Sequence, residues 1–312
     1  MHLRRSSYPA LGRKPRPPDP ELRHFHSMGY KLDGADFVSG RYAILRPIGT
    51  GGIGEVYEAF DAATISHVAL KIADGASADW ADCNRLLERE ASALSRIRHE
   101  NVVGYLGGGL EDGRRFLVMD LLRGMDLHRA LVGGGHMSFE EARPIGLQLC
   151  DALGAVHGKG MVHADLNPNN IIILEREARP VVIDFNLVRF IDDPDGDLDR
   201  NPSGITMGTR AYMAPEQYLA GHCSSFDQRV DVYGLGLVLY EMLTGESAFD
   251  RASLDRSGER FRHIMTVPPN RTPFFGKDVP KAAKDTIMKA LSKDPTERFC
   301  SMEEMADAID SI

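Results

Sequence analysis

Closely spaced cysteines are missing from this sequence. Its four cysteines, Cys83, Cys150, Cys223 and Cys300, lie far apart, and no Cys-x-x-Cys pair occurs. This distribution excludes the usual zinc and dithiol redox motifs. Reduced thiols in a cytoplasmic protein are the expectation that remains.

Long hydrophobic runs and an excess of positive charge are also missing. The longest apolar stretch, residues 232–243, contains Glu241 and is far shorter than the roughly 20 residues of a membrane-spanning helix. The basic N-terminus lacks the apolar core of a signal peptide. The formal net charge of −8 disfavours non-specific binding to nucleic acid.

What the chain does contain is the composition of a globular protein, with 43% hydrophobic and 26% charged residues among 312. Residues 1–36 are rich in arginine and proline, which predicts a disordered extension. In the remainder, residues 41–122 are dominated by strand patterns with one central helix, and residues 123–312 by helical patterns. We therefore expect an α+β fold with two lobes, and helices at 82–98, 139–157, 229–243, 280–292 and 301–310.

A glycine-rich loop, Gly49-Thr50-Gly51-Gly52-Ile53-Gly54, separates two predicted strands at 42–48 and 56–60. A dinucleotide-binding loop is followed by a helix, so this placement argues against that fold. Glycines let the backbone approach phosphate groups closely and offer its N–H groups. Taken alone, the loop could equally be an ordinary hairpin turn.

A lysine and a glutamate are each predicted to point into the interior. Lys71 shares a strand face with Ala69, because residues two apart on a strand lie on the same face. Glu90 lies on the apolar helix face with Leu87 and Leu94. A buried carboxylate is destabilising unless it is paired. The sequence thus predicts an ion pair, either purely structural or one that directs Lys71 to nucleotide phosphates.

A third group of polar residues surrounds a predicted hairpin of strands 171–174 and 180–183. Asn170 precedes the first strand and Asp184 follows the second, so both fall at one end of the hairpin. Two oxygen ligands there suit a hard cation such as Mg²⁺. Asp165 lies on the preceding loop, where we expect it to meet a substrate hydroxyl.

In this order, these motifs resemble the catalytic domain of eukaryotic-like serine/threonine protein kinases over residues 41–312. The resemblance rests on the motifs Gly49–Gly54, Val68–Lys71, Glu90, His163–Asp165 with Asn170, Asp184–Asn186, Ala214–Glu216, Asp231 and Arg298. It implies transfer of the γ-phosphoryl group of ATP to protein hydroxyls, including autophosphorylation, with Mg²⁺ or alternatively Mn²⁺. It does not indicate the protein substrate or the oligomeric state.

The resemblance also implies roles for individual residues. The catalytic set is Asp165, Lys71, Glu90, Asn167 and Thr209, and the metal ligands are Asn170 and Asp184. The ATP-binding set is Gly49, Gly51, Gly54, Val56, Ala69, Lys71, Asp120, Leu122 and Asp126, with Met119 as gatekeeper. Asp231 is expected to anchor the catalytic loop, and Arg298 to pair with Glu216.

Three positions depart from the family pattern. Ala164 replaces an arginine that binds an activation-loop phosphate, Asn167 replaces a lysine, and Asn186 replaces a glycine whose place needs a residue that tolerates positive φ. Ser203 and Thr206 remain candidate phosphorylation sites. The departures leave two alternatives open: a pseudokinase that only binds nucleotide or a partner, and a kinase-like phosphotransferase for small molecules.

Overall fold

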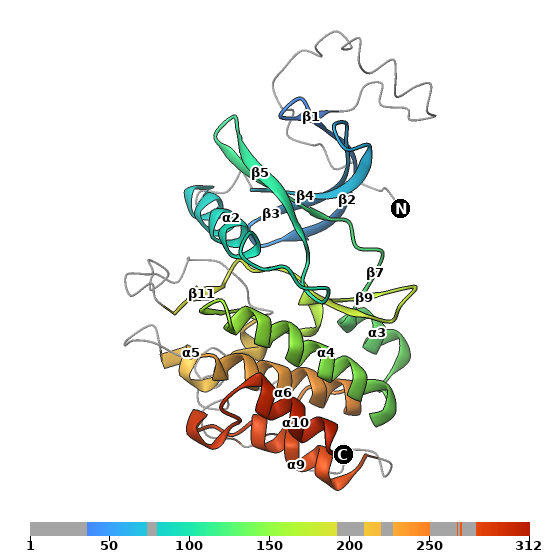
Figure 1. Cartoon of the computed structure of the whole chain (residues 1–312), viewed down its shortest axis with the longest axis vertical. Coiled ribbons are helices and arrows are strands. Elements are labelled where there is room, and N and C mark those ends of the chain that lie inside the picture. The colour runs from blue at the N-terminus through green and yellow to red at the C-terminus, as the bar shows by residue number, and fades with distance from the viewer. Residues whose placement is uncertain are drawn as a thin grey trace, which may run out of the picture.

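The computed structural model describes residues 36–73, 80–191, 209–219, 227–249, 267, 269 and 279–312. The predicted disorder of residues 1–35 and the candidate phosphorylation sites Ser203 and Thr206 lie outside the described residues. A strand-rich part with one helix sits at one end of the molecule, and a helical part sits at the other (Figure 1). The order of elements follows the order that the sequence predicts.

The strand-rich part is one antiparallel sheet in the order β1-β2-β3-β4-β6-β5. Its strands are β1 (Phe37–Val38), β2 (Tyr42–Gly51), β3 (Gly54–Asp61), β4 (Ser66–Ala73), β5 (Tyr105–Glu111) and β6 (Arg114–Asp120). The ladder between β2 and β3 continues to the pair Gly51–Gly54. The glycine-rich segment is therefore mostly paired strand, and the turn predicted for all of it contains only Gly52 and Ile53.

Alternate residues of β4 enter two different hydrophobic clusters. Val68 and Leu70 pack in a small cluster with Phe116 and Val118. Ala69, pointing the other way, belongs to the main core of the molecule. The period of two that the sequence predicted for this strand is therefore present, and it directs Lys71 toward the helical part.

Among the described residues of this part there is one helix, α2 (Trp80–Leu94), which packs against β4, β5 and β6. We predicted residues 82–98, so the predicted C-terminal end was wrong. The N–H groups of Arg96 and Ile97 bond to carbonyl oxygens three residues back, at 3.0 and 3.3 Å. This tightened turn ends the helix and leaves Ile97 buried, with 8% of its surface exposed.

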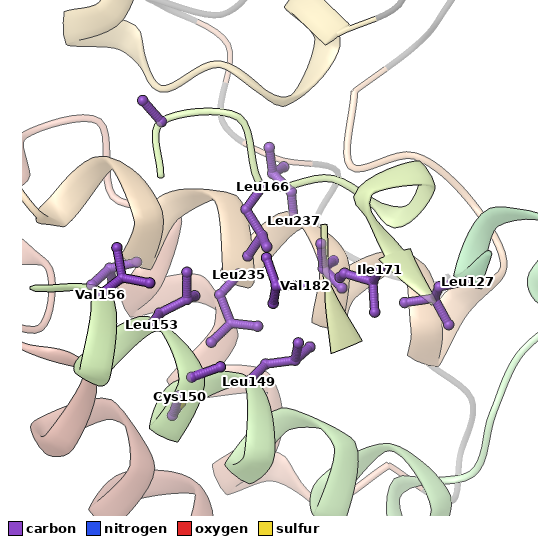
Figure 2. Packing of buried hydrophobic residues seen from close by; sticks show 14 of the residues in the cluster. Leu127, Leu149, Cys150, Leu153, Val156, Leu166, Ile171, Val182, Leu235 and Leu237 are labelled. Carbon is purple, nitrogen blue, oxygen red and sulfur yellow. The ribbon is translucent and has the colours of Figure 1, made fainter. Parts of the chain in front are cut away.

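The helical part is built around α6, which is almost entirely buried, and α4, which is buried along one face. Its described helices are α3 (Leu127–Gly134), α4 (Phe139–His157), α5 (Pro215–Leu219), α6 (Arg229–Thr244), α9 (Lys281–Ala290) and α10 (Met302–Asp310). Helix α4 packs against α6 and α10, and α6 against α9. Figure 2 shows leucines of α4 and α6 meeting Leu166, Ile171 and Val182 from the strands and loops above them. Each such side chain, when fully buried, contributes about 1.5–3 kcal/mol.

Two short ribbons lie between the sheet and the helices. In one, β9 (Ile171–Leu174) pairs antiparallel with β10 (Pro180–Val182) and with β7 (Gly124–Asp126). In the other, β8 (Met161–Val162) pairs with β11 (Arg189–Phe190). The 3-10 turns are η1 (Pro168–Asn170), η3 (Thr209–Tyr212) and η4 (Pro295–Glu297). The loops that join these ribbons carry the polar motifs.

No helix among the described residues combines the length and apolar character needed to cross a membrane.

A buried cation holds the segment after α9 against α5. Both terminal nitrogens of Arg298 donate to the carboxylate of Glu216, at 2.6 and 2.8 Å. This bidentate pair is the one the resemblance implied. The Arg298 side chain is fully buried, and three backbone carbonyls accept its remaining hydrogen bonds.

Lys293, close to Arg298, has no such acceptor. Its buried Nζ lies 4.2 Å from the centre of the Phe249 ring, and no described residue accepts a hydrogen bond from it. Burial, together with the positive charge of Arg298, lowers the pKa of Lys293 to about 8. Desolvation therefore outweighs the attraction of the ring.

This lowered pKa predicts a pH-dependent stability difference. The charged form is disfavoured in the folded protein, so the penalty is complete below about pH 8 and vanishes near the ordinary value of 10.5. The variant Lys293→Met should be more stable than the wild type at pH 7, and the difference should shrink by pH 10. Urea unfolding at both pH values measures it, with Lys289→Met as control for an exposed ammonium over a ring. A difference independent of pH would contradict this prediction.

Candidate active site

Lys71 lies at the centre of the polar groups between the two parts. Its Nζ donates to Glu90 Oε2 at 2.7 Å and to Asp184 Oδ1 at 2.9 Å. The first contact is the ion pair that strand and helix periodicity predicted. The second joins the sheet to the segment that follows β10. Only 6% of the Lys71 side chain is exposed, so this ammonium depends on its two carboxylates.

The charges around Lys71 keep it protonated. Burial alone would lower its pKa, but the carboxylates of Asp184 and Glu90 outweigh burial and raise the pKa above its ordinary value. The other oxygen of Glu90 accepts a hydrogen bond from the N–H of Phe185 at 3.3 Å. Glu90 thereby fixes both Lys71 and the residue next to Asp184.

The backbone at Asp184 has an unusual conformation. Its φ is 64°, in the left-handed region, and this turns its carboxylate toward Lys71. Asn186 is a residue type that tolerates positive φ, but it is not among the residues that adopt it, because the turn is made two residues earlier. Asn186 is instead buried, and its Oδ1 finds no hydrogen-bond donor among the described residues.

Asp231, near the start of α6, anchors the loop that carries Asp165. Its two oxygens accept hydrogen bonds from the backbone N–H groups of His163 at 2.9 Å and Ala164 at 2.8 Å. The ring of His157 adds a contact of 2.8 Å. Although burial pushes the pKa of Asp231 upward, the His157 contact and its other partners hold that pKa below its ordinary value. Asp231 thus acts as the resemblance implied.

Asp165 is held by two asparagine amides. The Nδ2 of Asn170 donates to Asp165 Oδ2 at 3.1 Å and to its backbone carbonyl at 2.9 Å. The Nδ2 of Asn167 lies 3.0 Å from the same carbonyl, while its Oδ1 caps η1 by accepting from the N–H of Asn169. Both ends of the Asn167 amide are therefore engaged within the loop. Its side chain contributes to the orientation of Asp165.

The site has the donor chemistry that a divalent cation requires. Burial and the Asp184 carboxylate raise the pKa of Asp165 well above its usual range, so the two carboxylates repel each other across the site. With Nδ2 of Asn170 bound to Asp165, no described residue donates to the Oδ1 of Asn170. Hard oxygen ligands of this kind fit Mg²⁺.

The three predicted glycines differ in what they do. A Cβ on Gly54 would lie 2.0 Å from the carbonyl oxygen of Ile72, so Gly54 is required by the packing of β3 on β4. At Gly49 and Gly51 the nearest atoms to such a Cβ lie 3.9 and 3.8 Å away. At these two positions an added Cβ would make only ordinary van der Waals contact. Of the other residues predicted to bind ATP, Ala69 belongs to the main core cluster and Val56 is packed against it.

Ile53, at the tip of the glycine-rich turn, is a residue that sequence reasoning missed. Only 1% of it is exposed, and it belongs to the main core. The turn is therefore held down by an apolar side chain. An isoleucine among glycines is the one signal that could have identified it.

The segment that links the two parts contains the predicted adenine-binding residues. Met119 is buried, and Asp120 donates its backbone N–H to Gly104 at 3.0 Å. Asp120 lines a groove of about 790 Å³, and the final turn of α2 and Arg179 also line this groove. Asp126 caps α3, because its Oδ1 accepts from the N–H of Arg129 at 2.8 Å. Leu122 is half-buried beside the core.

Thr209 begins η3, and its side chain lies outside the described residues. Gln217, which we did not predict, links this region to the catalytic loop. Its Nε2 donates to the carbonyl of Ala164 and its Oε1 accepts from the N–H of Ala214, both at 2.7 Å. An uncharged amide thus joins α5 to the position where the family carries arginine.

The arrangement of these groups defines a protein kinase domain, and comparison with known proteins agrees. Residues 42–308 match the protein kinase domain family, so the chain belongs to this family. The predicted two-lobed α+β fold and the resemblance to serine/threonine kinases are therefore confirmed. Members of the family use ATP and a divalent metal ion and act on protein substrates.

The chain is similar to serine/threonine-protein kinases of bacteria. The serine/threonine-protein kinase pkn3 of Myxococcus xanthus is 31% identical over 282 residues, 88% of this chain and 50% of the relative. The serine/threonine-protein kinase PrkC of Bacillus subtilis is 32% identical over 268 residues, 86% of this chain and 40% of the relative. This chain spans half or less of the length of these curated relatives.

Substitutions at Gly54 and Gly51 should have different effects on stability and on nucleotide binding. Gly54→Ala should lower the free energy of unfolding by about 1–3 kcal/mol, because the new methyl group meets backbone atoms that cannot move away cheaply. Gly51→Ala should leave stability nearly unchanged and weaken nucleotide binding. Thermal unfolding and nucleotide titration of both variants measure this. Equal losses of stability in the two variants would show that the predicted difference is wrong.

Proposed function

We propose that this chain is an active serine/threonine protein kinase that transfers the γ-phosphoryl group of ATP to protein hydroxyls and to itself. The single observation that carries the proposal is the contact of Lys71 with both Glu90 and Asp184. This contact brings together Lys71, the helix α2 that carries Glu90, and Asp184, the predicted metal ligand. We infer a catalytic domain at 41–312, with lobes 41–122 and 123–312, and a separate extension at 1–36.

In the proposed mechanism the chain supplies positions and charges. Lys71 binds the phosphates of ATP, and the backbone at Gly49 and Gly51 covers them. Asp165 orients the substrate hydroxyl and accepts its proton. The amides of Asn170 and Asn167 hold Asp165 in place for this role.

Asn170 and Asp184 are the residues that would hold Mg²⁺, with Mn²⁺ as an alternative. The bound ion would supply positive charge beside the phosphates. Thr209 is proposed to bond Asp165 and select serine and threonine, and Asp120, Leu122 and Asp126 to contact adenine and ribose. We also propose a cytoplasmic location, which the free thiols of Cys83, Cys150 and Cys300 support.

The pseudokinase alternative has no specific support. Lys71, Glu90, Asp165, Asn170 and Asp184 are all present, and nothing in the part of the chain that the structure describes favours it. Of the three departures, Asn167 and Ala164 are accommodated by amide hydrogen bonds.

The proposal predicts that Asp165→Asn separates catalysis from binding. Turnover should fall by about 100-fold or more, because general-base action is lost, while ATP affinity stays close to wild type. Transfer from labelled ATP with Mg²⁺ to generic protein substrates measures turnover, and nucleotide titration measures affinity. Lys71→Ala serves as the companion variant. It should lose phosphoryl transfer because the contact between Lys71 and the phosphates of ATP is removed. Wild-type turnover in either variant would refute the proposed roles.

A second prediction concerns activation. Ala164 takes the place of the arginine that binds such a phosphate in the family, and Gln217 already connects the catalytic loop to α5. Activity toward an outside substrate should therefore not depend strongly on phosphate in the activation segment. The double variant Ser203→Ala, Thr206→Ala, assayed after phosphatase treatment, checks this.

In that assay, a loss of about 100-fold, on the order of 3 kcal/mol, would show that another cation replaces the missing arginine. Ala164→Arg gives the converse test. If the absence of this arginine is the cause, restoring it should create a measurable dependence on phosphate.

A further inference from the structure

The ring of Phe190, on β11, is contacted by two cations from α2 and its final turn. The guanidinium carbon of Arg89 lies 5.1 Å from the ring centre, and that of Arg96 lies 4.6 Å from it. Both distances are within the range of about 6 Å for an attraction between a cation and an aromatic face. Phe190 is half-buried against the main core, where such contacts are stronger than in open solvent.

Arg89 is attached to the same segment a second time. Its Nε donates to the backbone carbonyl of Val188 at 2.5 Å. Two residues of the short segment after Asn186 are therefore held by one arginine. Because Arg89 precedes Glu90 directly, a displacement of the Arg89 backbone also displaces the carboxylate that pairs with Lys71.

Phe190 is fixed on its other side to the helical part. It pairs with Met161 in the ribbon of β11 and β8, and the N–H of Ile191 bonds to the carbonyl of Gly160 at 2.8 Å. β8 leads directly into His163 and the catalytic loop. The Phe190 ring thus connects α2 to the base of that loop.

We propose that Phe190 is a positioning residue whose ring, held by Arg89 and Arg96, keeps α2 where Glu90 meets Lys71. This link uses the face of a neutral ring, so it needs no phosphate. It offers a physical reason why the chain can lack the arginine at position 164. The proposal rests on the proposed phosphoryl transfer for its kinetic test.

The experiment compares Phe190→Leu with Phe190→Tyr. Leucine keeps apolar packing but removes the aromatic face, and tyrosine retains that face. We expect Phe190→Leu to lower kcat by about tenfold, the combined effect of two partly exposed contacts, with little change in KM for the protein substrate. Phe190→Tyr should retain most of the activity. Similar kcat values for the two variants would overturn the proposal, provided that thermal unfolding shows both to be folded.

A double-mutant cycle tests whether the cations act through the ring. Arg96→Met should lower kcat in the wild type but have little further effect in Phe190→Leu. The matched control is Lys289→Met, which removes a cation 4.0 Å from the Phe299 ring, far from α2 in the chain and outside the proposed link. This control should leave kcat unchanged. Additive effects of Arg96→Met and Phe190→Leu would contradict the link.

Hydrogen exchange separates this proposal from the proposed function. It reads the backbone amides of α2 (Trp80–Leu94) directly, without an assay of transfer. Phe190→Leu should speed exchange along α2 and Phe190→Tyr should not. If the wild type transfers no phosphate, the proposed function fails, but the exchange rates still decide whether Phe190 positions α2. Unchanged exchange in Phe190→Leu would count against the proposal in either case.

Discussion

The positive charge of Lys71 is the constraint on which this site depends. An ammonium buried to this extent is tolerated only with anionic partners, and removing one partner of such a pair is typically destabilising by about 3–5 kcal/mol. Its two partners come from α2 and from the segment after β10. One charge therefore sets the relative positions of three segments that are distant in the sequence.

A second set of buried charges arranges the helical part beneath the site. Asp231 holds the backbone of the catalytic loop from below, and Arg298 fixes Glu216 in the same way. Buried charges of this kind contribute more to a defined geometry than to net stability, because desolvation offsets much of their attraction. The largely apolar helix α6 thus supports the catalytic loop through the carboxylate of Asp231.

Two of the three departures from the family pattern are accommodated by amide hydrogen bonds. Asn167 donates to the carbonyl of Asp165, and Gln217 joins Ala164 to Ala214. Amides donate and accept at once and carry no charge, so these links do not vary with phosphorylation or salt as ion pairs do. The site is consequently organised by the folded chain itself.

Periodicity and motif order were sufficient to predict several features of this protein. The alternation along β4 and the helical spacing around Glu90 predicted their meeting, because both residues had to be paired if buried. The short hairpin of β9 and β10 likewise placed Asn170 and Asp184 at one end. The sequence by itself thus determined the fold class and the main polar groups.

Only the tertiary structure decided the contacts between separate elements. Four features depend on how neighbouring segments are placed. They are the close approach of Gly54 to Ile72, the burial of Ile53, the positive φ at Asp184 and the cations over Phe190. A repeat pattern reports which side of one element is buried. It carries no information about which atom of another element, up to a hundred residues away, will lie against that side.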